Sequence, residues 1–480
     1  MTKPKFFALL TLLFISTHLA AAYTLEDFKA EVSEKDSSYK AVQYEDEASQ
    51  YNLQKKELPT ATRLYSSNKF FDDTRPVMNP SFQGDRTLGY EVSLGLKQQS
   101  SFGLNWDLSQ HVKRTKIFGV APGVFPLSDF YDFFPQAQVS IPLWKNFLGK
   151  EVRAQTRALS QATQLQRLQA LLNKAQKEAE IESIYYQYGI QKNLFELSQK
   201  NLERSEKLYS WIRERRLKNL VDESDEMQAK AARALRKLDF DKNTKDIELI
   251  TSTFNSYRGG ISAEHVDSLK FDFLAPQSLE KLSQEKRESL IEKLKSTQIE
   301  AEKAQNQIQK EGLKPTLELT GMAALQGHDA GFSKSAGDLL DSKKNIWGVG
   351  INFEMPLDFT LTRKLLKATR LSIKANDAQL ERSSIKQELA WMKQREDLQR
   401  CAQSIVLLKE LEDSQKTRLA SEEKKYKNGR GTLFFVLSAE QDYINAQAQK
   451  WANELQCRII EAQTKLYIAE SAESEEGKTL

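Results

Sequence analysis

The residues with the greatest capacity for covalent chemistry are the two cysteines, Cys401 and Cys457. They lie at equal distances from Gly429, 28 residues before it and 28 residues after it. If two antiparallel helices fold about a turn at Gly429, both thiols lie at the same height, and an oxidising compartment would allow a disulfide. Two buried free thiols are the alternative. This alternative is preferred, because the centre of the turn is defined only to within a few residues.

The histidines form no catalytic or metal-binding pattern. His111, His265 and His328 lie far apart, in segments with the composition of strands or loops. The string NGRGT (428–432) lacks the Gly-Lys-Ser/Thr end of a phosphate-binding loop. Because no catalytic triad, metal-ligand spacing or cofactor motif is found, we expect neither an enzyme nor a bound metal or cofactor.

The composition excludes further classes. With 28% charged residues and a mean hydropathy of −0.58, the chain does not suit a helical membrane protein. Without Lys3 and Lys5, 68 basic residues (70 − 2) balance 66 acidic ones. The two signs are mixed along the chain, which is typical of solvated helix faces, so no nucleic-acid partner is expected.

The first 22 residues have the pattern of a secretory signal peptide. Two lysines are followed by the apolar run 6–15 and by three alanines at 20–22. About ten apolar residues are too few to span a membrane, so a membrane anchor is disfavoured. Cleavage would leave Tyr23 as the first residue.

Very long helices must position the rest of the chain. Residues 146–216 contain no proline, and their apolar residues recur at alternating steps of three and four, as at Leu165, Leu168 and Leu172. A helix of this length would extend about 105 Å. Its narrow apolar seam indicates packing beside similar helices, with wide polar faces in water. A second such run covers 359–426.

Other segments alternate with a period of two, which predicts half-buried strands. These segments are 88–96, 102–108, 137–143, 317–325 and 347–355. The intervening 68–85, 114–129 and 327–344 have the composition of loops.

A soluble β-sandwich and a membrane barrel both alternate in this way. The length of the runs and the aromatic residues near their ends favour the barrel. The aromatic girdle of such a barrel would include Trp106, Tyr131, Phe133, Phe134 and Trp144.

The same order of elements occurs twice. The first repeat covers 23–260, with a helix, strands at about 60–143, a long helix at 146–216 and a helix at 223–257. After a linker (261–277), the second repeat covers 278–470, with a helix at 278–310, strands at about 315–355, a long helix at 359–426 and a helix at 433–470. A polar tail (471–480) follows. Two strand pairs cannot close a barrel, and an open edge cannot face lipid, so several chains would have to share one barrel.

The chain resembles the outer-membrane efflux protein family, the TolC-type channels. The resemblance rests on the strand-to-helix joints IPLWKNFLG (141–149) and MPLDF (355–359). It also rests on the turn YKNGRGTLFFVLSAEQDYINAQ (426–447) and on its counterpart RRLKNLVDESDEMQAKA (215–231). The order and duplication of these segments carry the resemblance over nearly all of the mature chain.

The resemblance implies a mainly α-helical protomer with membrane β-strands. Three copies would form a β-barrel in the outer membrane, continued by an α-helical barrel in the periplasm. Such a homotrimer is the passive exit duct of a tripartite efflux or type I secretion system. Its partners are a periplasmic adaptor protein, an inner-membrane pump and outer-membrane lipid. The exported substrate is not indicated.

One feature departs from the family pattern. Four strands in each of three chains give the family's twelve, and the alternating pair 88–96 and 102–108 is additional. This pair either widens the barrel or lies outside the bilayer.

The resemblance places the adaptor-docking surface at the tips of the two helical hairpins. The expected docking residues are Leu217, Asn219, Leu220, Val221, Tyr426, Gly429, Arg430, Gly431, Thr432 and Leu433. The glycines allow the positive φ that a tight helical hairpin needs.

A constriction is expected near the same tips. Some channels of this family have aspartates one turn beyond the glycine, where this chain has Phe435 and Ser438. The gate would therefore be apolar, from Phe434 and Phe435, or acidic, from Asp222, Glu223, Asp225 and Glu226. Acidic residues in the first turn of a helix also favour its dipole without any gating role.

A structural protein is the alternative function. In that interpretation the chain is a periplasmic coiled-coil scaffold, and its strands form a soluble β-sandwich.

Overall fold

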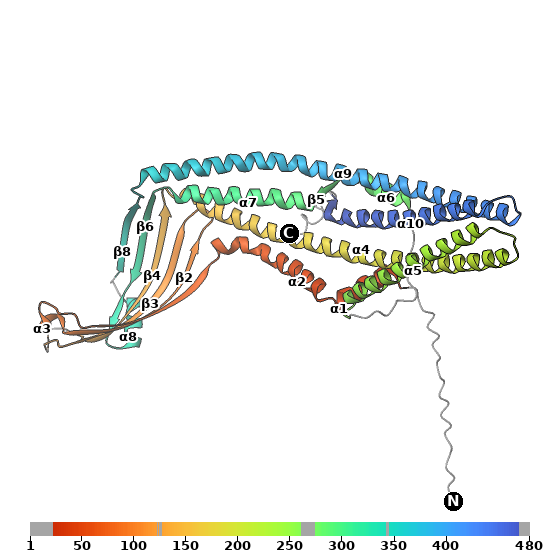
Figure 1. The fold of residues 1–480 in the computed structure, drawn as a ribbon. Coiled ribbons are helices and arrows are strands. Elements are labelled where there is room, and N and C mark those ends of the chain that lie inside the picture. Colours follow the sequence, from red (N-terminus) through yellow and green to blue (C-terminus); the bar gives the residue numbers. More distant parts are fainter. Residues whose placement is uncertain (1–22, 122, 124–126, 261–273, 342–344, 470–480) are drawn as a thin grey trace, which may run out of the picture. The chain divides into compact units, whose positions relative to one another are not determined.

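The computed structural model describes residues 23–121, 123, 127–260, 274–341 and 345–469 (Figure 1). The expected signal peptide and polar tail, and most of the expected linker, lie outside these residues. The chain divides into two compact units. The sheet unit consists of Asp46–Ala170 and Ile291–Gln387, and the helical unit consists of Met1–Glu45, Leu171–Leu290 and Glu388–Leu480. The two very long helices, α4 (Lys150–Leu217) and α9 (Phe359–Lys427), contribute residues to both units.

The sheet unit contains one antiparallel sheet with the strand order β1-β2-β3-β4-β6-β8, and the short β7 pairs with β4. The strands are β1 (Arg63–Asp73), β2 (Arg86–Gln99), β3 (Asn105–Phe118), β4 (Asp129–Pro142), β6 (Thr316–Leu325), β7 (Gly327–Asp329) and β8 (Asn345–Glu354). Within the described part of the chain, β1 and β8 are open edges.

The strand register separates an apolar face from a polar face. One continuous row across the apolar face contains Leu64, Leu96, Leu108, Ala137, Ala323 and Trp347. The adjacent row on the polar face contains Arg63, Lys97, Asp107, Gln138, Met322 and Gly348. Because successive side chains of a strand point to opposite sides, the two rows line opposite surfaces of the same sheet.

The strands are longer than the sequence pattern indicated. Residues 68–73 belong to β1 and residues 114–118 belong to β3, although both segments were predicted as loops. The segment 327–344, also predicted as a loop, contains β7 and the helix α8 (Phe332–Asp341). Conversely, Phe102 lies in a turn rather than in a strand. The pair 88–96 and 102–108 is in the main sheet, since β2 and β3 lie between β1 and β4.

An asparagine shapes the joint between β4 and α4. Asn146 has a left-handed φ of 59°, and its side-chain oxygen accepts hydrogen bonds from the backbone N–H groups of Glu151 and Val152 at 3.0 and 3.2 Å. These are two of the N–H groups that a helix start leaves without a partner. Gly149 has a φ of 74°, and a Cβ there would lie 2.1 Å from the carbonyl oxygen of Ser101. This joint therefore requires glycine at position 149.

In the sheet unit, α7 (Leu290–Gly312) packs along the first part of α9. The amide of Asn306 donates to the hydroxyl of Ser372 at 2.9 Å, and Lys303 pairs with Asp377 at 2.8 Å. The sequence predicted one helix over 278–310, but the chain has α6 (Pro276–Gln284), β5 (Arg287–Ser289) and then α7. The interruption has a non-local cause, because β5 pairs with β9 (Tyr467–Ala469) near the other end of the chain.

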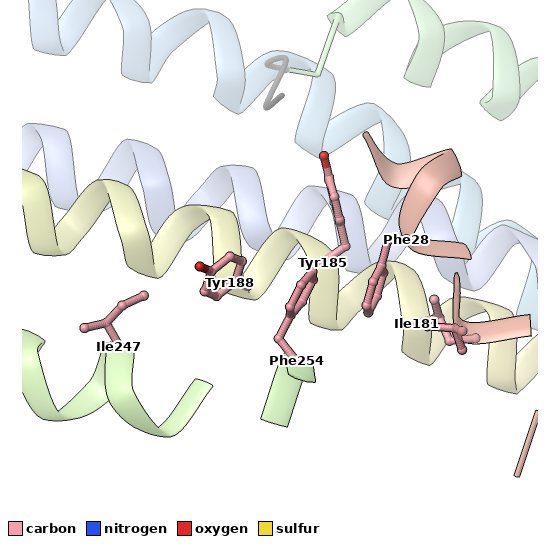
Figure 2. Close-up of a cluster of buried hydrophobic side chains, with 7 residues drawn as sticks. Phe28, Ile181, Tyr185, Tyr188, Ile247 and Phe254 are labelled. Carbon is pink, nitrogen blue, oxygen red and sulfur yellow. The ribbon is translucent and has the colours of Figure 1, made fainter. Parts of the chain in front are cut away.

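The helical unit contains α1 (Leu25–Lys35), α5 (Glu223–Tyr257), α6, α10 (Leu433–Gln463) and the later residues of α4 and α9. An aromatic cluster joins α1, α4 and α5 (Figure 2). Phe254 stacks on Phe28 with ring centroids 4.2 Å apart and on Tyr188 at 4.6 Å. All three side chains are fully buried. Burial of these three rings fixes the first helical hairpin, formed by α4 and α5, against α1.

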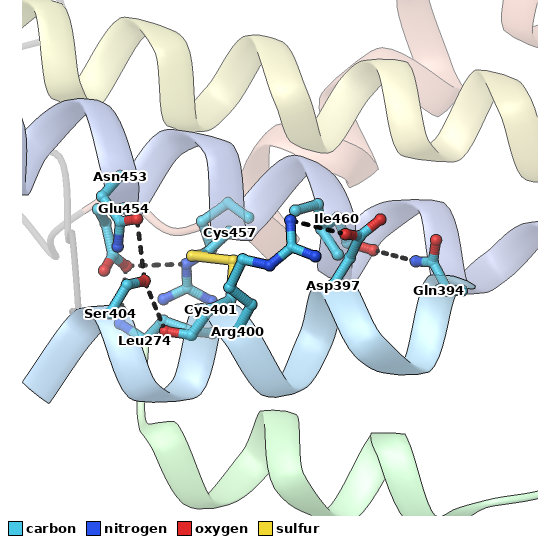
Figure 3. The surroundings of a disulfide bond; sticks show 11 residues. Leu274, Gln394, Asp397, Arg400, Cys401, Ser404, Asn453, Glu454, Cys457 and Ile460 are labelled. Atoms are coloured by element: carbon cyan, nitrogen blue, oxygen red, sulfur yellow. Dashed lines mark hydrogen bonds and ion pairs between the residues drawn. A yellow bond between two sulfur atoms is a disulfide. The ribbon is translucent and has the colours of Figure 1, made fainter. Parts of the chain in front are cut away.

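A disulfide joins Cys401 of α9 to Cys457 of α10, with a Cα–Cα distance of 5.6 Å (Figure 3). The preference for two free thiols is therefore wrong. The turn at Gly429 does place the two thiols at one height, and both side chains point into the seam between the helices. Next to the disulfide, the hydroxyl of Ser404 donates to the side-chain oxygen of Asn453 at 3.0 Å, also between α9 and α10.

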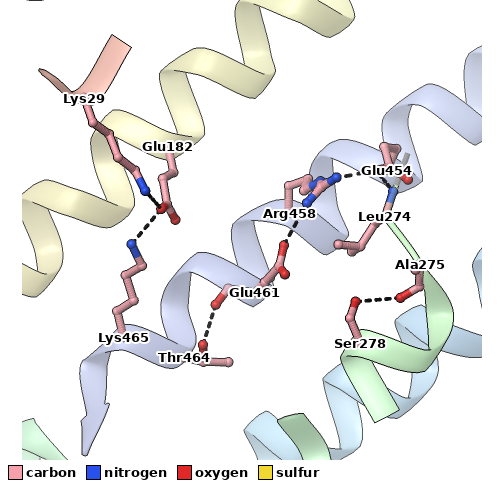
Figure 4. Close-up of polar contacts among 10 residues, drawn as sticks. All are labelled: Lys29, Glu182, Leu274, Ala275, Ser278, Glu454, Arg458, Glu461, Thr464 and Lys465. Atoms are coloured by element: carbon pink, nitrogen blue, oxygen red, sulfur yellow. Dashed lines mark hydrogen bonds and ion pairs between the residues drawn. The ribbon is translucent and has the colours of Figure 1, made fainter. Parts of the chain in front are cut away.

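Buried charges connect the other helices of this unit (Figure 4). Glu182 of α4 pairs with Lys29 of α1 at 2.8 Å and with Lys465 at 2.6 Å. Glu454 of α10 accepts a hydrogen bond from the backbone N–H of Leu274 at 2.7 Å. Burial raises the pKa of Glu454 above its ordinary value. These contacts attach α1 to α4, and the segment just before α6 to α10.

Because of Glu31, the stability of the helical unit should depend on pH in the acid range. Burial alone would raise the pKa of Glu31, but hydrogen bonds from Arg258, Lys35 and Tyr23 outweigh it and lower the pKa from 4.5 to about 2. A lowered pKa in the folded state contributes stability above pH 4.5, and this contribution is lost as the pH falls toward 2. We expect a Glu31→Gln variant to be less stable than the wild type by up to about 3 kcal/mol near neutral pH.

Urea unfolding at a series of pH values measures this difference. The gap between the wild type and Glu31→Gln should narrow steadily below pH 4.5. A gap that does not change with pH would contradict the assignment.

Candidate functional site

The two hairpin tips have the same backbone geometry. In the first, Asn219 has a φ of 54°, its N–H donates to the carbonyl of Arg216 at 2.8 Å, and the N–H of Leu220 donates to Arg215 at 2.9 Å. In the second, Gly429 has a φ of 70° and makes the corresponding bond to Tyr426 at 3.0 Å. This is the Schellman arrangement that ends a helix with a left-handed residue. Asn219 and Gly429 are therefore equivalent positions of the two repeats.

Apolar side chains from both hairpins pack together just inside the tips. Leu433 has no exposed surface and contacts Ile212 and Ala229, which belong to the first hairpin. The ring of Trp211 packs edge-on against that of Tyr426, with centroids 5.7 Å apart. Burial raises the pKa of Tyr426, and the nearby carboxylate of Asp225 adds to the effect. The tips thus form one packed cluster within the helical unit.

Ion pairs surround this cluster. Arg216 near the end of α4 bonds to Glu226 at the start of α5 and lies 3.8 Å from Glu223. Deeper in the hairpins, Arg204 bonds to Glu423 and lies 3.4 Å from Glu440. The ion pairs of Arg204 link α4 of the first hairpin to α9 and α10 of the second hairpin.

The predicted docking and gate residues differ in their exposure to solvent. Leu433 and Glu226 are buried, and Tyr426, Val221, Asp225 and Ser438 are half-buried. In this conformation Leu433 holds the hairpins together instead of presenting a docking surface, and Glu226 is the partner of Arg216. The exposed group consists of Leu217, Asn219, Leu220, Asp222, Glu223, Gly429, Arg430, Thr432, Phe434 and Phe435. Gly431 is half-buried.

Two exposed phenylalanines follow the second turn. Phe434 and Phe435 are 61% and 51% exposed, and their ring centroids lie 5.7 Å apart. Adjacent exposed apolar side chains of this size are candidates for contact with a partner. Sequence reasoning missed Trp211, Ile212 and Ala229, although their spacing along α4 and α5 follows the apolar seam of each helix.

Truncation of Leu433 should loosen the tips. Leu433→Ala removes the buried side chain that joins the two hairpins, and such changes cost roughly 2–5 kcal/mol. We expect faster hydrogen exchange across 428–440 and a lower free energy of unfolding. Leu220→Ala, at an exposed leucine of the other turn, is the matched control and should change neither quantity. Equal effects of the two substitutions would show that the hairpins are not held by Leu433.

The second candidate site is the apolar face of the sheet. Trp347, Val349 and Ile351 on β8 are 76%, 68% and 68% exposed. Among the described residues, the sheet unit contains no second sheet that could cover this face. All six strands of the main path have at least 10 residues, enough to cross the hydrocarbon core of a bilayer.

Aromatic rows border this face. Phe70, Tyr90 and Tyr131 lie in one row near the loop end of the strands, with Arg114 beside them. Trp106 lies opposite Val139. Val139 is eight residues beyond Tyr131 along β4, so the two positions are about 27 Å apart. An apolar band of about 25 Å between aromatic girdles is typical of outer-membrane barrels. Phe134, which was predicted for the girdle, is instead on the polar face, where it stacks on His111 at 4.7 Å.

None of the helices in the described part of the chain is both long and apolar enough to cross a membrane. The described residues also contain no group of three or more His, Cys, Asp or Glu side chains placed to hold a metal ion.

Comparison with solved structures defines the class to which this fold belongs. The outer membrane protein VceC from Vibrio cholerae matches with a TM-score of 0.60 and 14% identity, over 92% of this chain and 94% of VceC. The open state of the MtrE outer membrane channel of Neisseria gonorrhoeae matches at 0.58 and 13%, over 92% and 88%. The CmeC outer membrane channel of Campylobacter jejuni matches at 0.57 and 14%, over 100% and 98%.

No family model and no curated protein sequence matches this chain. The similarity is therefore one of fold. The chain has the protomer fold of outer-membrane channels, over nearly its whole length. The expected fold class, very long helices combined with antiparallel strands, is confirmed.

Proposed function

We propose that this chain is one protomer of an outer-membrane exit duct in a tripartite efflux or type I secretion system. The apolar face of the sheet supports this proposal most strongly. One row of apolar residues crosses all six strands, and its large side chains at Leu64, Leu96, Leu108 and Trp347 are exposed, while the opposite face is polar. Such a sheet is stable with lipid on one side and water on the other.

The open edges favour a closed assembly of several copies. Unpaired N–H and C=O groups of β1 and β8 cannot face lipid, because nothing there replaces water as their hydrogen-bond partner. In a homotrimer, β1 of each copy would pair with β8 of the next. Six strands from each of three copies give eighteen, since β2 and β3 are continuous with the sheet. Barrels of 16–18 strands enclose an aqueous channel, so the additional pair would widen the pore.

The hairpin tips are our proposed docking and gating region. Leu217, Leu220 and Arg430 are exposed around the two turns and offer apolar and basic contacts to a periplasmic adaptor. The exposed pair Phe434 and Phe435 supports an apolar gate. The acidic alternative has less support, because Glu226 is buried against Arg216.

Reconstitution tests the proposed function. The mature chain, expressed in a Gram-negative host, should appear in the outer-membrane fraction as a trimer that resists detergent. In planar bilayers it should give discrete conductance steps. A soluble periplasmic monomer would contradict the duct and favour the scaffold, whose β-sandwich needs a cover for the apolar face.

The gate has its own test. Removing the ring of Phe435 should widen an apolar constriction, so Phe435→Ala should raise single-channel conductance or the fraction of time that the channel is open. Leu217→Ala, at an exposed residue of the other turn, is the control. Unchanged conductance in Phe435→Ala would contradict the apolar gate.

A further inference from the structure

Two lysines on the polar face of the sheet lie over one aromatic ring. The Nζ atoms of Lys69 on β1 and Lys113 on β3 lie 5.9 and 5.7 Å from the centre of the Phe71 ring. The register places both lysines in one row, on either side of Glu91. The face of an aromatic ring attracts ammonium groups. Two positive charges are therefore held at one place on this surface.

A glycine fixes the position of the ring. Phe71 pairs with Gly89 on β2, and a Cβ on Gly89 would lie 2.1 Å from the ring atoms of Phe71. The ring thus lies against the backbone of β2 at a position that has no side chain. The pattern recurs with Tyr65 over Gly95, where the Nζ of Lys97 lies 5.1 Å from the centre of the Tyr65 ring. Ring and lysine together form a defined element of the surface.

The carboxylates nearest to the lysines are bound to imidazoles. Glu91 lies 3.2 Å from the Nδ1 atom of His111. Asp132, which pairs across the strands with Lys113, is buried and lies 2.7 Å from the Nδ1 atom of His328. Neither lysine over the Phe71 ring forms an ion pair within the described part of the chain. Both carboxylates are thus engaged by imidazoles, and the ammonium groups of Lys69 and Lys113 remain available to an anion that reaches this point of the polar face.

The row of the two lysines lies at the level of an aromatic border. On the apolar face, the row next to it contains Phe70, Tyr90 and Tyr131. If that border marks the surface of the membrane, the lysines line the mouth of the pore at the loop end of the strands.

We propose that Lys69 and Lys113, supported by Phe71, form an anion-binding position on the pore wall, at which the carboxylate, sulfonate or phosphate group of a passing solute is held. This proposal rests on the proposed channel function. Three copies would place six ammonium groups around the mouth. Charged rings of this kind set the ion preference of a pore.

Reversal potentials across a bilayer with a potassium chloride gradient test the proposal. Lys69→Gln with Lys113→Gln should shift the permeability ratio of chloride to potassium toward potassium by about twofold or more. Lys116→Gln is the matched control. Lys116 is on the same strand as Lys113 and also lies over a ring, that of Phe118 at 5.1 Å, but it belongs to the opposite face. Its replacement should leave the ratio unchanged.

A second measurement uses inorganic tripolyphosphate as the probe. Added at the loop side, it should reduce the current through the wild type and the Lys116→Gln variant at a concentration that leaves the double variant unaffected. A conducting wild type whose permeability ratio and block are the same in the double variant would overturn the anion site and leave the channel intact. A trimer that never conducts would overturn the channel itself, and the site with it.

Discussion

Replacing Cys401 and Cys457 by alanine is expected to lower the free energy of unfolding of the helical unit by about 4 kcal/mol. The disulfide closes a segment with a sequence separation of 56 residues, which includes the whole tip of the second hairpin. A cross-link of this span removes much of the conformational freedom of the unfolded chain. Both sulfur atoms are buried among Leu398, Trp391 and Ala402, so alanine adds no polar group to the seam.

Guanidinium unfolding measures this effect. The wild type should lose the same stability when a reductant is added, whereas the double alanine variant should not respond to the reductant. A wild type whose unfolding midpoint is the same with and without reductant would show that the cross-link contributes nothing to stability.

The disulfide also bears on how the tips could open. It fixes α9 to α10, and Leu433 at the start of α10 packs between residues of the first hairpin. Any motion that exposes Leu433 therefore moves α9 and α10 together as a pair. The ion pairs of Arg204 with Glu423 and Glu440 on those two helices resist the same motion. Opening must separate the two hairpins from each other, instead of separating the two helices of one hairpin.

The sequence predicted elements whose signal is local. Period-two alternation located strands where one face is wholly apolar, as in β2 and β8. It failed in β1, where Leu64, Tyr65, Phe70 and Phe71 put apolar residues on both faces. On the polar face, Tyr65 and Phe71 fill space over glycines of β2. That use depends on the neighbouring strand, so β1 alone does not show it.

Polarity misled the prediction at the loop end of the sheet. Arg114 and Lys116 belong to the apolar face of β3 by register, but they lie beyond the apolar band, where polar residues are expected in a strand that leaves the membrane. The segment therefore has the composition of a loop. The same limit applies to α8, whose contacts are with β4 and β7: the hydroxyl of Ser335 donates to the carbonyls of Tyr131 and Gly327.

The tips show which part of a site can be predicted from spacing. The equivalence of Asn219 and Gly429 could be predicted, because a left-handed residue at the end of a helix is a local requirement. The burial of Leu433 could not, since Ile212 and Ala229 lie more than 200 residues away in the other repeat. The cysteine pair is intermediate. The position of the turn predicts that both thiols lie at the same level along the two helices. The rotation of α9 and α10 about their axes, which turns the thiols toward each other, depends on packing.

The largest effect expected in the sheet unit comes from a charge on its apolar face. Ile351 of β8 is 68% exposed and belongs to the apolar face, while its neighbour Asn352 belongs to the polar face. In a lipid-facing strand, arginine costs up to about 2–4 kcal/mol per chain, less near the borders of the apolar band than at mid-depth, and three copies would each bear that cost. Ile351→Arg should therefore abolish or strongly reduce the detergent-resistant trimer in the outer-membrane fraction. Asn352→Arg, one position along the same edge strand, should assemble as the wild type does.

The contrast between Ile351→Arg and Asn352→Arg tests whether the apolar face of the sheet contacts lipid. If β8 were covered by a second sheet, both faces would be in protein or in water. Arginine at position 351 would then leave a soluble, misfolded chain instead of one that fails only at membrane insertion. Urea unfolding of the soluble fraction distinguishes these outcomes. Normal assembly of Ile351→Arg would show that the apolar face does not contact lipid, whereas loss of assembly in Asn352→Arg alone would show that the two faces of the sheet had been assigned in reverse.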